Sequence, residues 1–334
     1  MADTITLSIA EAEALLKAAF TNIGVPDATA ASVARALAAA EAEGQVGHGF
    51  SRLTDYAAQV QSGKINAAVE PVLTRPAPAA IYVDAGLGFA YPAMEAALDA
   101  GISLAQEMGI ALMAIGNSHH CGALSIQVER MANAGLIGLM VANAPKAIAP
   151  WGAREPVFGT NPIAFASPRA DGPPLVIDLS LSKVARGKVM AAKKAGTDIP
   201  PNWALDVDGN PTTDPDAALT GTMVPIGEAK GTALALMVEL LAAALTGSAF
   251  SREAGSFFHA DGPAPRVGQT LIAIDPGHTG AYGARVSELL SQISAMDGAR
   301  LPGERRQKAI AAAARDGIQV PAAFISQANT LAGE

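Results

Sequence analysis

Apolar residues in the first sixty positions recur at helical spacing. The pattern predicts three helices, over residues 8–24, 27–44 and 51–61. Ser8 followed by Glu11 is a capping-box pattern that opens the first helix, and Asp27 is the expected cap of the second. Leu53 and Tyr56 share an apolar face of the third. The chain is therefore expected to begin with a helical segment.

After residue 65, short apolar runs alternate with longer amphipathic stretches. The runs predict strands at 71–73, 80–83, 110–115, 136–142, 163–166, 175–177 and 271–274, and the stretches predict helices at 92–108, 123–134, 229–246, 281–293 and 305–314, the last followed by a tail. Residues 196–215 are dense in Pro, Asp, Asn and Gly and are expected to form an extended, ordered loop. This alternation without a repeating unit indicates an α/β fold. We expect residues 1–70 to pack with residues 280–334 in a helical layer, and residues 71–279 to form an α/β domain.

Composition narrows the class of protein. Half of the 334 residues are hydrophobic, only 4% are aromatic, and the formal net charge is −8, as in a globular α/β protein with an aliphatic core. The negative charge disfavours nucleic acid as a partner, because binding to phosphate backbones depends on clustered Lys and Arg. An anionic small molecule would need a local basic pocket.

The cysteine count and the apolar runs bear on the cellular compartment. The single cysteine, Cys121, cannot form an internal disulfide, which fits a reducing cytoplasm. The N-terminal residues do not have the basic and apolar regions of a secretory signal. The most apolar long run, 232–250, contains Glu239 and is rich in Ala, which favours a helix buried in protein over a membrane span. We expect a cytoplasmic protein with no membrane segment.

Common phosphate and nucleophile motifs do not match the sequence. The nearest approach to a dinucleotide fingerprint is Gly86-Leu87-Gly88, and it fails because Tyr91 stands where the third Gly should be. There is no Gly-Lys-Ser/Thr phosphate loop, no Gly-x-Ser-x-Gly elbow and no cysteine pair for zinc. A Rossmann cofactor domain and the kinase, serine-hydrolase and structural-zinc classes therefore lose support.

Three other segments are candidate sites. At residues 116–123 a predicted strand passes through His119 and His120 into a helix start, where backbone N–H groups and an imidazole could bind a phosphate. A capped turn explains these residues equally well. Adjacent histidines point apart and no carboxylate follows at helical spacing, so we expect no metal site. The Gly/Pro-rich turns at 149–152 and 158–162 are constrained enough to position a ligand, but they could also be purely structural.

The third candidate is Gly47-His48-Gly49, followed by Arg52 one turn later. A His between two glycines can approach a ligand closely, and imidazole titrates in the range needed for proton transfer to a reduced carbonyl or imine. A guanidinium one turn away could hold a carboxylate with two hydrogen bonds. Taken alone, such a pair is more often a surface feature.

Together these segments carry a family resemblance. They are His48-Gly49 with Arg52, Gly63-Lys64-Ile65-Asn66, Asn117-Ser118 with His120, Ala149-Pro150-Trp151-Gly152, Gly159-Thr160-Asn161-Pro162, Ala185-Arg186-Gly187-Lys188, Pro211-Thr212-Thr213-Asp214-Pro215 and Lys230-Gly231. Over nearly its whole length the chain resembles the type 2 malate/L-lactate dehydrogenase family. It is most similar in style to the Δ1-piperideine-2-carboxylate and Δ1-pyrroline-2-carboxylate reductases.

The resemblance implies a homodimer with a non-Rossmann, mixed-sheet cofactor domain that binds NADH or NADPH and a small anionic substrate, without a metal. By position, His48 would be the proton donor, and Arg52 and Thr160 would contact the substrate. The implied cofactor contacts are His120, Cys121, Gly122, Ala123, Leu124, Asp178, Leu179, Ser180, Ala229, Lys230, Pro302, Gly303, Glu304 and Arg305. Residues 71–279 would then hold both cofactor and substrate.

The chain departs from the family pattern at positions that bear on the reaction. The family usually has Ser before the catalytic His, where this chain has Gly47, and the imine reductases have Asp where this chain has Lys188. Both members of the relay thought to orient and recharge the His are therefore missing. Glu228 and Ala229 also replace the usual Gly and His/Tyr before Lys230, which leaves the choice between NADH and NADPH open.

We expect an NAD(P)H-dependent reductase of a cyclic 2-imino acid. A 2-hydroxyacid dehydrogenase of malate or lactate type is the alternative within the enzyme class. A catalytically silent metabolite- or nucleotide-binding protein is the alternative from a different class.

Overall fold

The computed structural model describes residues 3–277 and 280–334. Its centre is a seven-stranded mixed sheet in the order β2-β3-β4-β10-β5-β6-β7. The strands are β2 (Val72–Ala77), β3 (Ala80–Asp84), β4 (Ile110–Ser118), β5 (Ile137–Ala142), β6 (Ile163–Ser167), β7 (Leu175–Leu179) and β10 (Val267–Ile274). Only β3 and β4 are parallel, joined by a helical crossover, and every other pair in this sheet is antiparallel. The mixed-sheet α/β fold predicted from the sequence is confirmed, and it is not a doubly wound Rossmann sheet.

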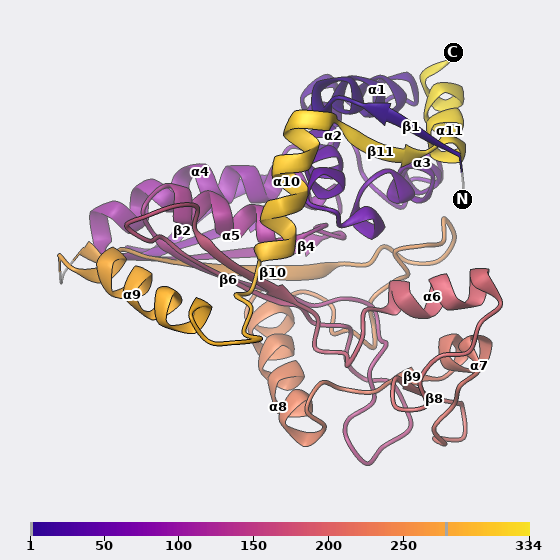
Figure 1. The fold of residues 1–334 in the computed structure, drawn as a ribbon. Coiled ribbons are helices and arrows are strands. Elements are labelled where there is room, and N and C mark those ends of the chain that lie inside the picture. The colour runs from indigo at the N-terminus through magenta and orange to yellow at the C-terminus, as the bar shows by residue number, and fades with distance from the viewer. Residues whose placement is uncertain (1–2, 278–279) are drawn as a thin grey trace.

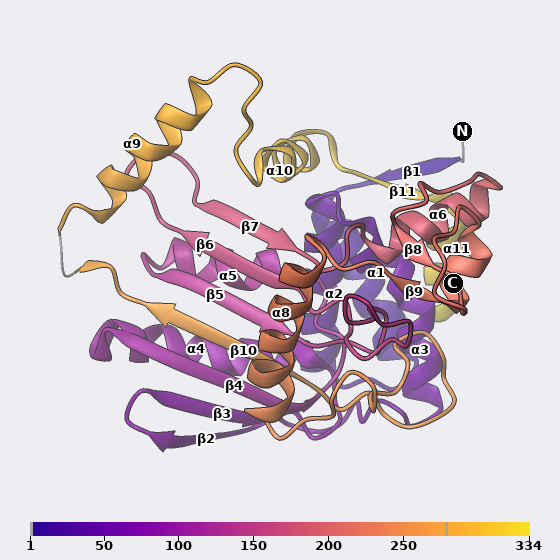
Figure 2. The same cartoon turned by 90° about the horizontal axis from the view of Figure 1, so that it is seen from below.

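Helices cover both faces of the sheet (Figure 1). On one face, α4 (Ala90–Met108) packs on β3 and β4, and α5 (Leu124–Asn133) packs on β5 and β6. On the other face, α8 (Ala229–Val238) crosses the strands and continues into a π-helical segment, η3 (Glu239–Ala244), which contacts β10 (Figure 2). The single helix predicted over 229–246 is thus an α-helix followed by a wider turn. That turn begins at Glu239, whose buried carboxylate accepts hydrogen bonds from Asn161 Nδ2 (2.8 Å) and Ser251 N (3.0 Å).

The N-terminal helices form a separate layer beside the sheet. They are α1 (Ile9–Asn22), α2 (Asp27–Ala42) and α3 (Leu53–Gln61). Both halves of the predicted Ser8–Glu11 capping box are present. Asp27, the expected cap of α2, is instead its first helical residue, because Pro26 takes the cap position.

The C-terminal segment completes this layer in part. Helix α10 (Glu304–Asp316) contacts α2, strand β11 (Ile318–Pro321) pairs with β1 (Thr4–Leu7), and α11 (Ala322–Ala332) packs on α1. The predicted tail after residue 314 is therefore a strand and a helix. Helix α9 (Tyr282–Ser294) does not join the layer: it lies at the far end of the sheet, where Tyr282 Oη is 2.9 Å from Ser167 Oγ (Figures 1 and 2).

A smaller lobe lies below the N-terminal layer in Figure 1. It contains α6 (Arg186–Ala195), β8 (Ala204–Leu205), α7 (Pro215–Thr220) and β9 (Thr222–Met223), packed around an apolar cluster that they share with β5, α8 and η3. The predicted loop over 196–215 is ordered, but it includes β8 and ends at Asp214. The carboxylate of Asp214 caps α7 by accepting from Asp216 N (2.8 Å).

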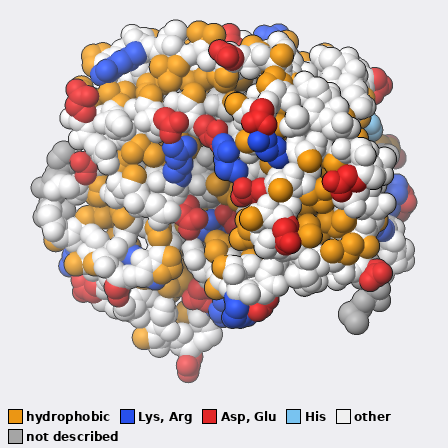
Figure 3. Space-filling model, turned by 90° about the horizontal axis from the view of Figure 1, so that it is seen from above, with side chains coloured by type: hydrophobic (Ala, Val, Ile, Leu, Met, Phe, Trp, Pro, Cys, Tyr) orange, Lys and Arg blue, Asp and Glu red, His pale blue; other side chains and the backbone are white. Residues whose placement is uncertain are grey.

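Two further features concern the length of the helices and the charge on the surface. Among the described residues, no helix combines the length and the apolar character needed to cross a bilayer. On the face shown in Figure 3, Lys and Arg side chains are interspersed with Asp and Glu between patches of hydrophobic side chains. Neither charge sign dominates that face.

Candidate active site

The turn that carries His48 is built on a buried acid. Two 3-10 turns, η1 (Val46–His48) and η2 (Phe50–Arg52), follow α2 and meet at Gly49. A Cβ atom on Gly49 would lie 2.4 Å from Glu41 Oε1, so only glycine allows this packing. Phe50 N donates to Glu41 Oε1 over 2.8 Å. Burial raises the pKa of Glu41 to about 7, although this hydrogen bond acts in the opposite direction.

Arg52 is held on three sides. Its Nε donates to Gly47 O over 2.8 Å, its Nη1 lies 3.7 Å from the carboxylate of Asp55, and its guanidinium carbon is 4.6 Å from the centre of the Phe258 ring. These contacts fix the guanidinium in the same turn as His48. A carboxylate ligand would meet a cation whose position is already set.

Three histidines form a cluster beside this turn. The rings of His48 and His120 are stacked, with centroids 5.2 Å apart and planes 11° from parallel. Tyr56 Oη is 2.5 Å from His120 Nδ1, and Gln59 Oε1 is 2.9 Å from His119 Nε2. Burial and then the Arg52 charge lower the pKa of His48 to about 4, and burial, Lys64 and Arg52 lower the pKa of His119 to about 3. Burial and the same guanidinium also lower the pKa of His120, so all three rings are neutral at pH 7.

A segment not singled out from the sequence closes over the cluster. Phe257 packs against His119 and His120, with ring centroids 5.5 and 5.0 Å apart. Its carbonyl accepts from Gln59 Nε2 over 2.9 Å, and the next carbonyls, of His259 and Asp261, accept from Lys64 Nζ. Two adjacent phenylalanines in a chain with only 4% aromatic residues are the one sequence signal that could have drawn attention here.

The segments expected to bind the cofactor meet along strand β7, at the edge of the sheet. Leu181 N donates to Thr160 O, and Ile226 N donates to Leu181 O, both over 2.8 Å, which places the 226–230 segment next to the end of β7. Gly303 packs so closely that a Cβ atom would lie 2.7 Å from Val176 O. Within the described residues, Thr160 belongs to this group and makes no hydrogen bond to the histidine cluster.

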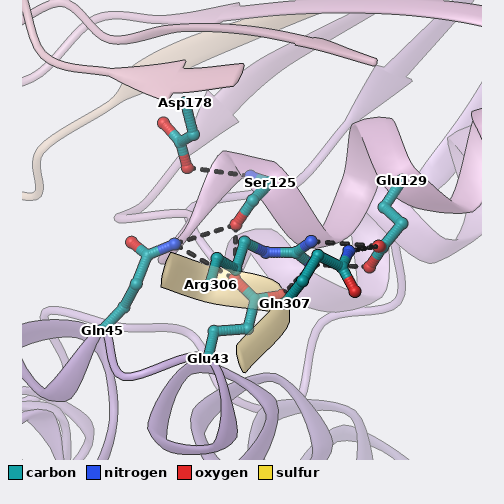
Figure 4. A network of polar contacts seen from close by, with 7 residues as sticks. All are labelled: Glu43, Gln45, Ser125, Glu129, Asp178, Arg306 and Gln307. Carbon is teal, nitrogen blue, oxygen red and sulfur yellow. Dashed lines mark hydrogen bonds and ion pairs between the residues drawn. The ribbon is translucent and has the colours of Figure 1, made fainter. Parts of the chain in front are cut away.

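A polar network joins β7 to the histidine turn (Figure 4). Ser125 N donates to Asp178 Oδ2 (2.9 Å), and Ser125 Oγ donates to Glu43 (2.6 Å) and accepts from Gln45 Nε2 (2.9 Å). Arg306 forms ion pairs with the buried Glu43 and the part-buried Glu129. One N–H group at the start of α5, where the sequence suggested a phosphate site, is therefore bound by the chain's own Asp178.

These residues fit a dinucleotide. The predicted cofactor segments are close together in space, and two glycines in them, Gly122 and Gly303, adopt positive φ values of 67° and 82°, which keep side chains away from the turns. Lys230 and Arg305 are exposed in the same segments and offer cations to phosphate groups. Carboxylates that accept hydrogen bonds, such as Asp178, are the usual partners of ribose hydroxyls.

Positions 47 and 188, where the family resemblance implies relay residues, hold Gly and Lys. A Cβ atom on Gly47 would meet nothing within 4 Å, and Lys188 is exposed on α6. His48 Nδ1 is enclosed and has no hydrogen-bond partner among the described residues.

A further pocket, of about 900 Å³, lies at the smaller lobe. The expected turn at 149–152 belongs to it, and the chain returns so that Ile148 bridges to Phe158. It is also lined by Leu205, Asp208, Gly209, Pro211 and residues 223–225. None of the histidine-cluster residues lines it.

Together, the mixed sheet, the grouped segments expected to bind a cofactor and the histidine–arginine turn point to a non-Rossmann oxidoreductase of the nicotinamide-dependent class. The chain belongs to the malate/L-lactate dehydrogenase family, whose model matches residues 7–329. The resemblance inferred from the sequence is thereby confirmed, and the protein is an NAD(P)-dependent oxidoreductase.

Relatives within this family have different substrates. The chain is 49% identical over 327 residues to the (2R)-3-sulfolactate dehydrogenase (NADP(+)) of Chromohalobacter salexigens, covering 98% of both chains. It is 41% identical over 313 residues to a Δ1-pyrroline-2-carboxylate/Δ1-piperideine-2-carboxylate reductase of Pseudomonas putida, covering 93% of this chain and 92% of the relative.

Solved structures of relatives share the fold. The Δ1-piperideine-2-carboxylate reductase of Pseudomonas syringae pv. tomato superposes with a TM-score of 0.93 at 39% identity, covering 98% of this chain and 100% of that one. The sulfolactate dehydrogenase of Methanocaldococcus jannaschii gives 0.90 at 28% identity, covering 98% and 97%.

Proposed function

We propose that this chain is an NADP-dependent 2-hydroxyacid dehydrogenase that interconverts (2R)-3-sulfolactate and its 2-oxo acid. The observation that carries the proposal is the fixed pair of His48 and Arg52, a proton carrier and a carboxylate clamp in one turn. The 49% identity to a sulfolactate dehydrogenase supports this substrate, and so does the lack of the relay residues associated with imine reductases.

The charges around the histidines suit a substrate with two anionic groups. Arg52 lies in the histidine turn, and Lys64, whose Nζ donates to the carbonyls of His259 and Asp261, supplies a second positive charge beside the cluster. Among the described residues Arg52 donates a hydrogen bond only through Nε, and its contact with Asp55 is long, at 3.7 Å, so its Nη groups are available to bind the carboxylate. Thr160 is the proposed second substrate contact, from the β7 side.

His48 is the proposed acceptor and donor of the substrate's hydroxyl proton. Because burial and Arg52 lower its pKa to about 4, His48 is neutral before substrate binds and can accept the hydroxyl proton of a 2-hydroxyacid. In the reductive direction, a carboxylate bound to Arg52 offsets the guanidinium charge, which raises the pKa of His48 and lets it carry the proton needed by the new alkoxide. The nicotinamide ring supplies or accepts the hydride when bound.

The proposed cofactor contacts are the segments grouped along β7. The stretch from His120 to Leu124 lies between the histidine cluster and Ser125, so it would connect the nicotinamide end to the rest of the cofactor. Lys230 and Arg305 would bind phosphates, and their positive charge favours NADPH.

A cyclic 2-imino acid is the second candidate substrate, favoured by relatives at 38–42% identity that are named as pyrroline-2-carboxylate or piperideine-2-carboxylate reductases. The deciding experiment follows NADPH and NADH consumption with 3-sulfopyruvate, pyruvate, oxaloacetate and Δ1-pyrroline-2-carboxylate, and NADP⁺ reduction with (2R)-3-sulfolactate. We expect the highest kcat/KM for the sulfonated pair. Turnover of the imine alone would establish the second candidate, and tight cofactor binding without any turnover would indicate a silent binding protein.

Two substitutions test the residue roles. His48→Ala should abolish most turnover and leave the Kd of NADPH unchanged, whereas Arg52→Ala should mainly raise the substrate KM. Arg35→Ala is the matched control, because Arg35 pairs with Glu95 on the surface. Wild-type rates in His48→Ala would contradict its role.

We also infer a homodimer. Helix α8 and its continuation expose apolar side chains on one side, including Leu234, Leu236, Met237 and Leu240. A contiguous apolar surface of this kind is typical of a subunit interface. A second copy of the chain, meeting α8 with its own α8, would bury the same residues on both subunits.

A further inference from the structure

One face of helix α3 contacts His119 and His120 through polar side chains. Arg52, Tyr56 and Gln59 are spaced four and three residues apart, so they share one face at the start of the helix and along it. Tyr56 meets His120 and Gln59 meets His119. The sequence pattern alone indicates only that Tyr56 belongs to an apolar face.

The hydrogen bonds of Gln59 fix the tautomer of His119. Gln59 Nε2 donates to Phe257 O (2.9 Å) and to Asp55 O (3.2 Å). Its Oε1 must therefore be the acceptor that faces His119, and His119 donates through Nε2. His119 is a neutral ring with a bare Nδ1.

The hydrogen-bond donors and acceptors around His120 fix its tautomer in the same way. Tyr91 Oη and Tyr56 Oη are 3.0 Å apart, and Tyr56 Oη is 2.5 Å from His120 Nδ1. If Tyr91 donates to Tyr56 and Tyr56 donates to His120, both buried hydroxyl protons are used. In the reverse direction, the proton of Tyr91 would be buried without an acceptor among the described residues, at a cost. The favoured arrangement makes His120 a neutral ring protonated at Nε2.

His48 has no such partner. Its Nδ1 is enclosed and has no partner among the described residues, and the two positions where the family resemblance implies relay residues hold Gly47 and the exposed Lys188. The ring it stacks on is His120.

We propose that Tyr56, backed by Tyr91, is a positioning residue: it locks His120 as the neutral Nε2–H tautomer, and the locked ring orients His48 by stacking, in place of the missing Ser–Asp relay. The proposal rests on the proposed function of His48 as the proton carrier. A locked neutral His120 also keeps a second positive charge away from His48, so His48 is the ring that protonates when an anion binds to Arg52.

The described titratable groups that face the His48–His120 pair come from several elements. They are Arg52, Tyr56 and, more distantly, Asp55 from η2 and α3, Tyr91 from α4, His119 and Cys121 from the 119–121 segment, and Glu41 from α2 beneath Gly49, while Lys64 acts on the neighbouring His119. Burial raises the pKa values of both tyrosines and of Cys121, so these groups keep their protons. Arg52 is the nearest fixed positive charge.

The first experiment reads the tautomer directly. In wild-type protein with ¹⁵N-labelled histidine at pH 7, His120 should show a protonated Nε2 and a bare Nδ1, with a His120→Gln variant used for assignment. A protonated Nδ1, or an imidazolium ring, would overturn the proposal. This measurement needs no turnover and no variant of Tyr56.

The second experiment removes one hydroxyl. Tyr56→Phe takes away the donor to His120 Nδ1, so His120 should protonate more readily and disfavour protonation of His48. We expect kcat to fall about tenfold with little change in substrate KM, and the limb of the kcat profile assigned to His48 to move by about one pH unit to lower pH.

Two further tyrosine variants test whether the change in kcat depends on which hydroxyl is removed. Tyr91→Phe keeps the bond from Tyr56 to His120 and should change kcat about threefold or less. Tyr282→Phe, which removes a hydroxyl from its contact with Ser167 on the far end of the sheet, should change neither kcat nor the pH profile. Equal effects in Tyr56→Phe and Tyr282→Phe would refute the positioning role.

Failure of the proposed function is distinguishable from failure of this inference. If the wild type turns over none of the substrates, the function is wrong, but the ¹⁵N resonances of His48 still decide the positioning claim. They should shift in Tyr56→Phe and stay unchanged in Tyr282→Phe. Unchanged His48 resonances in both variants would reject it.

Discussion

Glu41 predicts a specific dependence of stability on pH. Burial raises its pKa from 4.5 to about 7, so the folded chain holds a proton that the unfolded chain releases above pH 4.5. The stabilisation from this proton is fully present below pH 4.5 and is lost as the pH rises through 7. A shift of about 2.5 units corresponds to about 3 kcal/mol, at about 1.4 kcal/mol per unit.

Glu41→Gln removes this pH-dependent stabilisation and keeps a side-chain oxygen that accepts a hydrogen bond from Phe50 N. Relative to the wild type, the variant should gain about 3 kcal/mol in free energy of unfolding between pH 4.5 and pH 8. The assay is urea unfolding at a series of pH values, followed by circular dichroism and repeated on Glu107→Gln, whose side chain is exposed on α4. A constant difference between Glu41→Gln and the wild type across this range would refute the reasoning that burial governs Glu41.

Four other changes have expected outcomes. Gly49→Ala should disrupt the histidine turn and lower kcat more than tenfold, because its Cβ would overlap Glu41, whereas Gly47→Ala, with open space at the Cβ position, should be nearly silent in the same steady-state assay. Glu228→Gly should stabilise the chain by about 1–2 kcal/mol in urea unfolding, because Glu228 has φ 59° and ψ −120°, a conformation suited to glycine; no gain would contradict the strain. Arg306→Met should cost about 3 kcal/mol in the same unfolding assay, because it leaves buried carboxylates unpaired; a loss under 1 kcal/mol would count against the network. Leu240→Glu on η3 should convert a dimer to a monomer in sedimentation velocity, while the equally exposed Leu289→Glu on α9 should not.

The parts of the fold that could be predicted are those with a strong local pattern. Strands β4 and β5 are continuous apolar runs, and α4 has an apolar face along its whole length, so their positions were predicted within a few residues. Helix α6 was missed because Val189 is its only buried side chain, which leaves no apolar stripe to detect. Strands β1 and β11 are four residues each and are defined by pairing with one another from opposite ends of the chain.

The candidate site shows the same division. His48 and Arg52 could be singled out because flanking glycines and helical spacing are visible in the sequence. The roles of Tyr56 and Gln59 could not, since they depend on contacts with residues sixty or more positions away. Phe257 and Phe258 reach the site only because the segment after η3 folds back over α3, and no local pattern encodes that path.

The pairing of β1 with β11 has a consequence for biosynthesis. The helical layer that carries the histidine turn is closed by residues 318–332, which leave the ribosome more than 250 residues after the turn itself. During translation, the nascent chain can form the local helices of this layer but not its final closure, so acquisition of activity should follow the emergence of residues 318–332 from the ribosome.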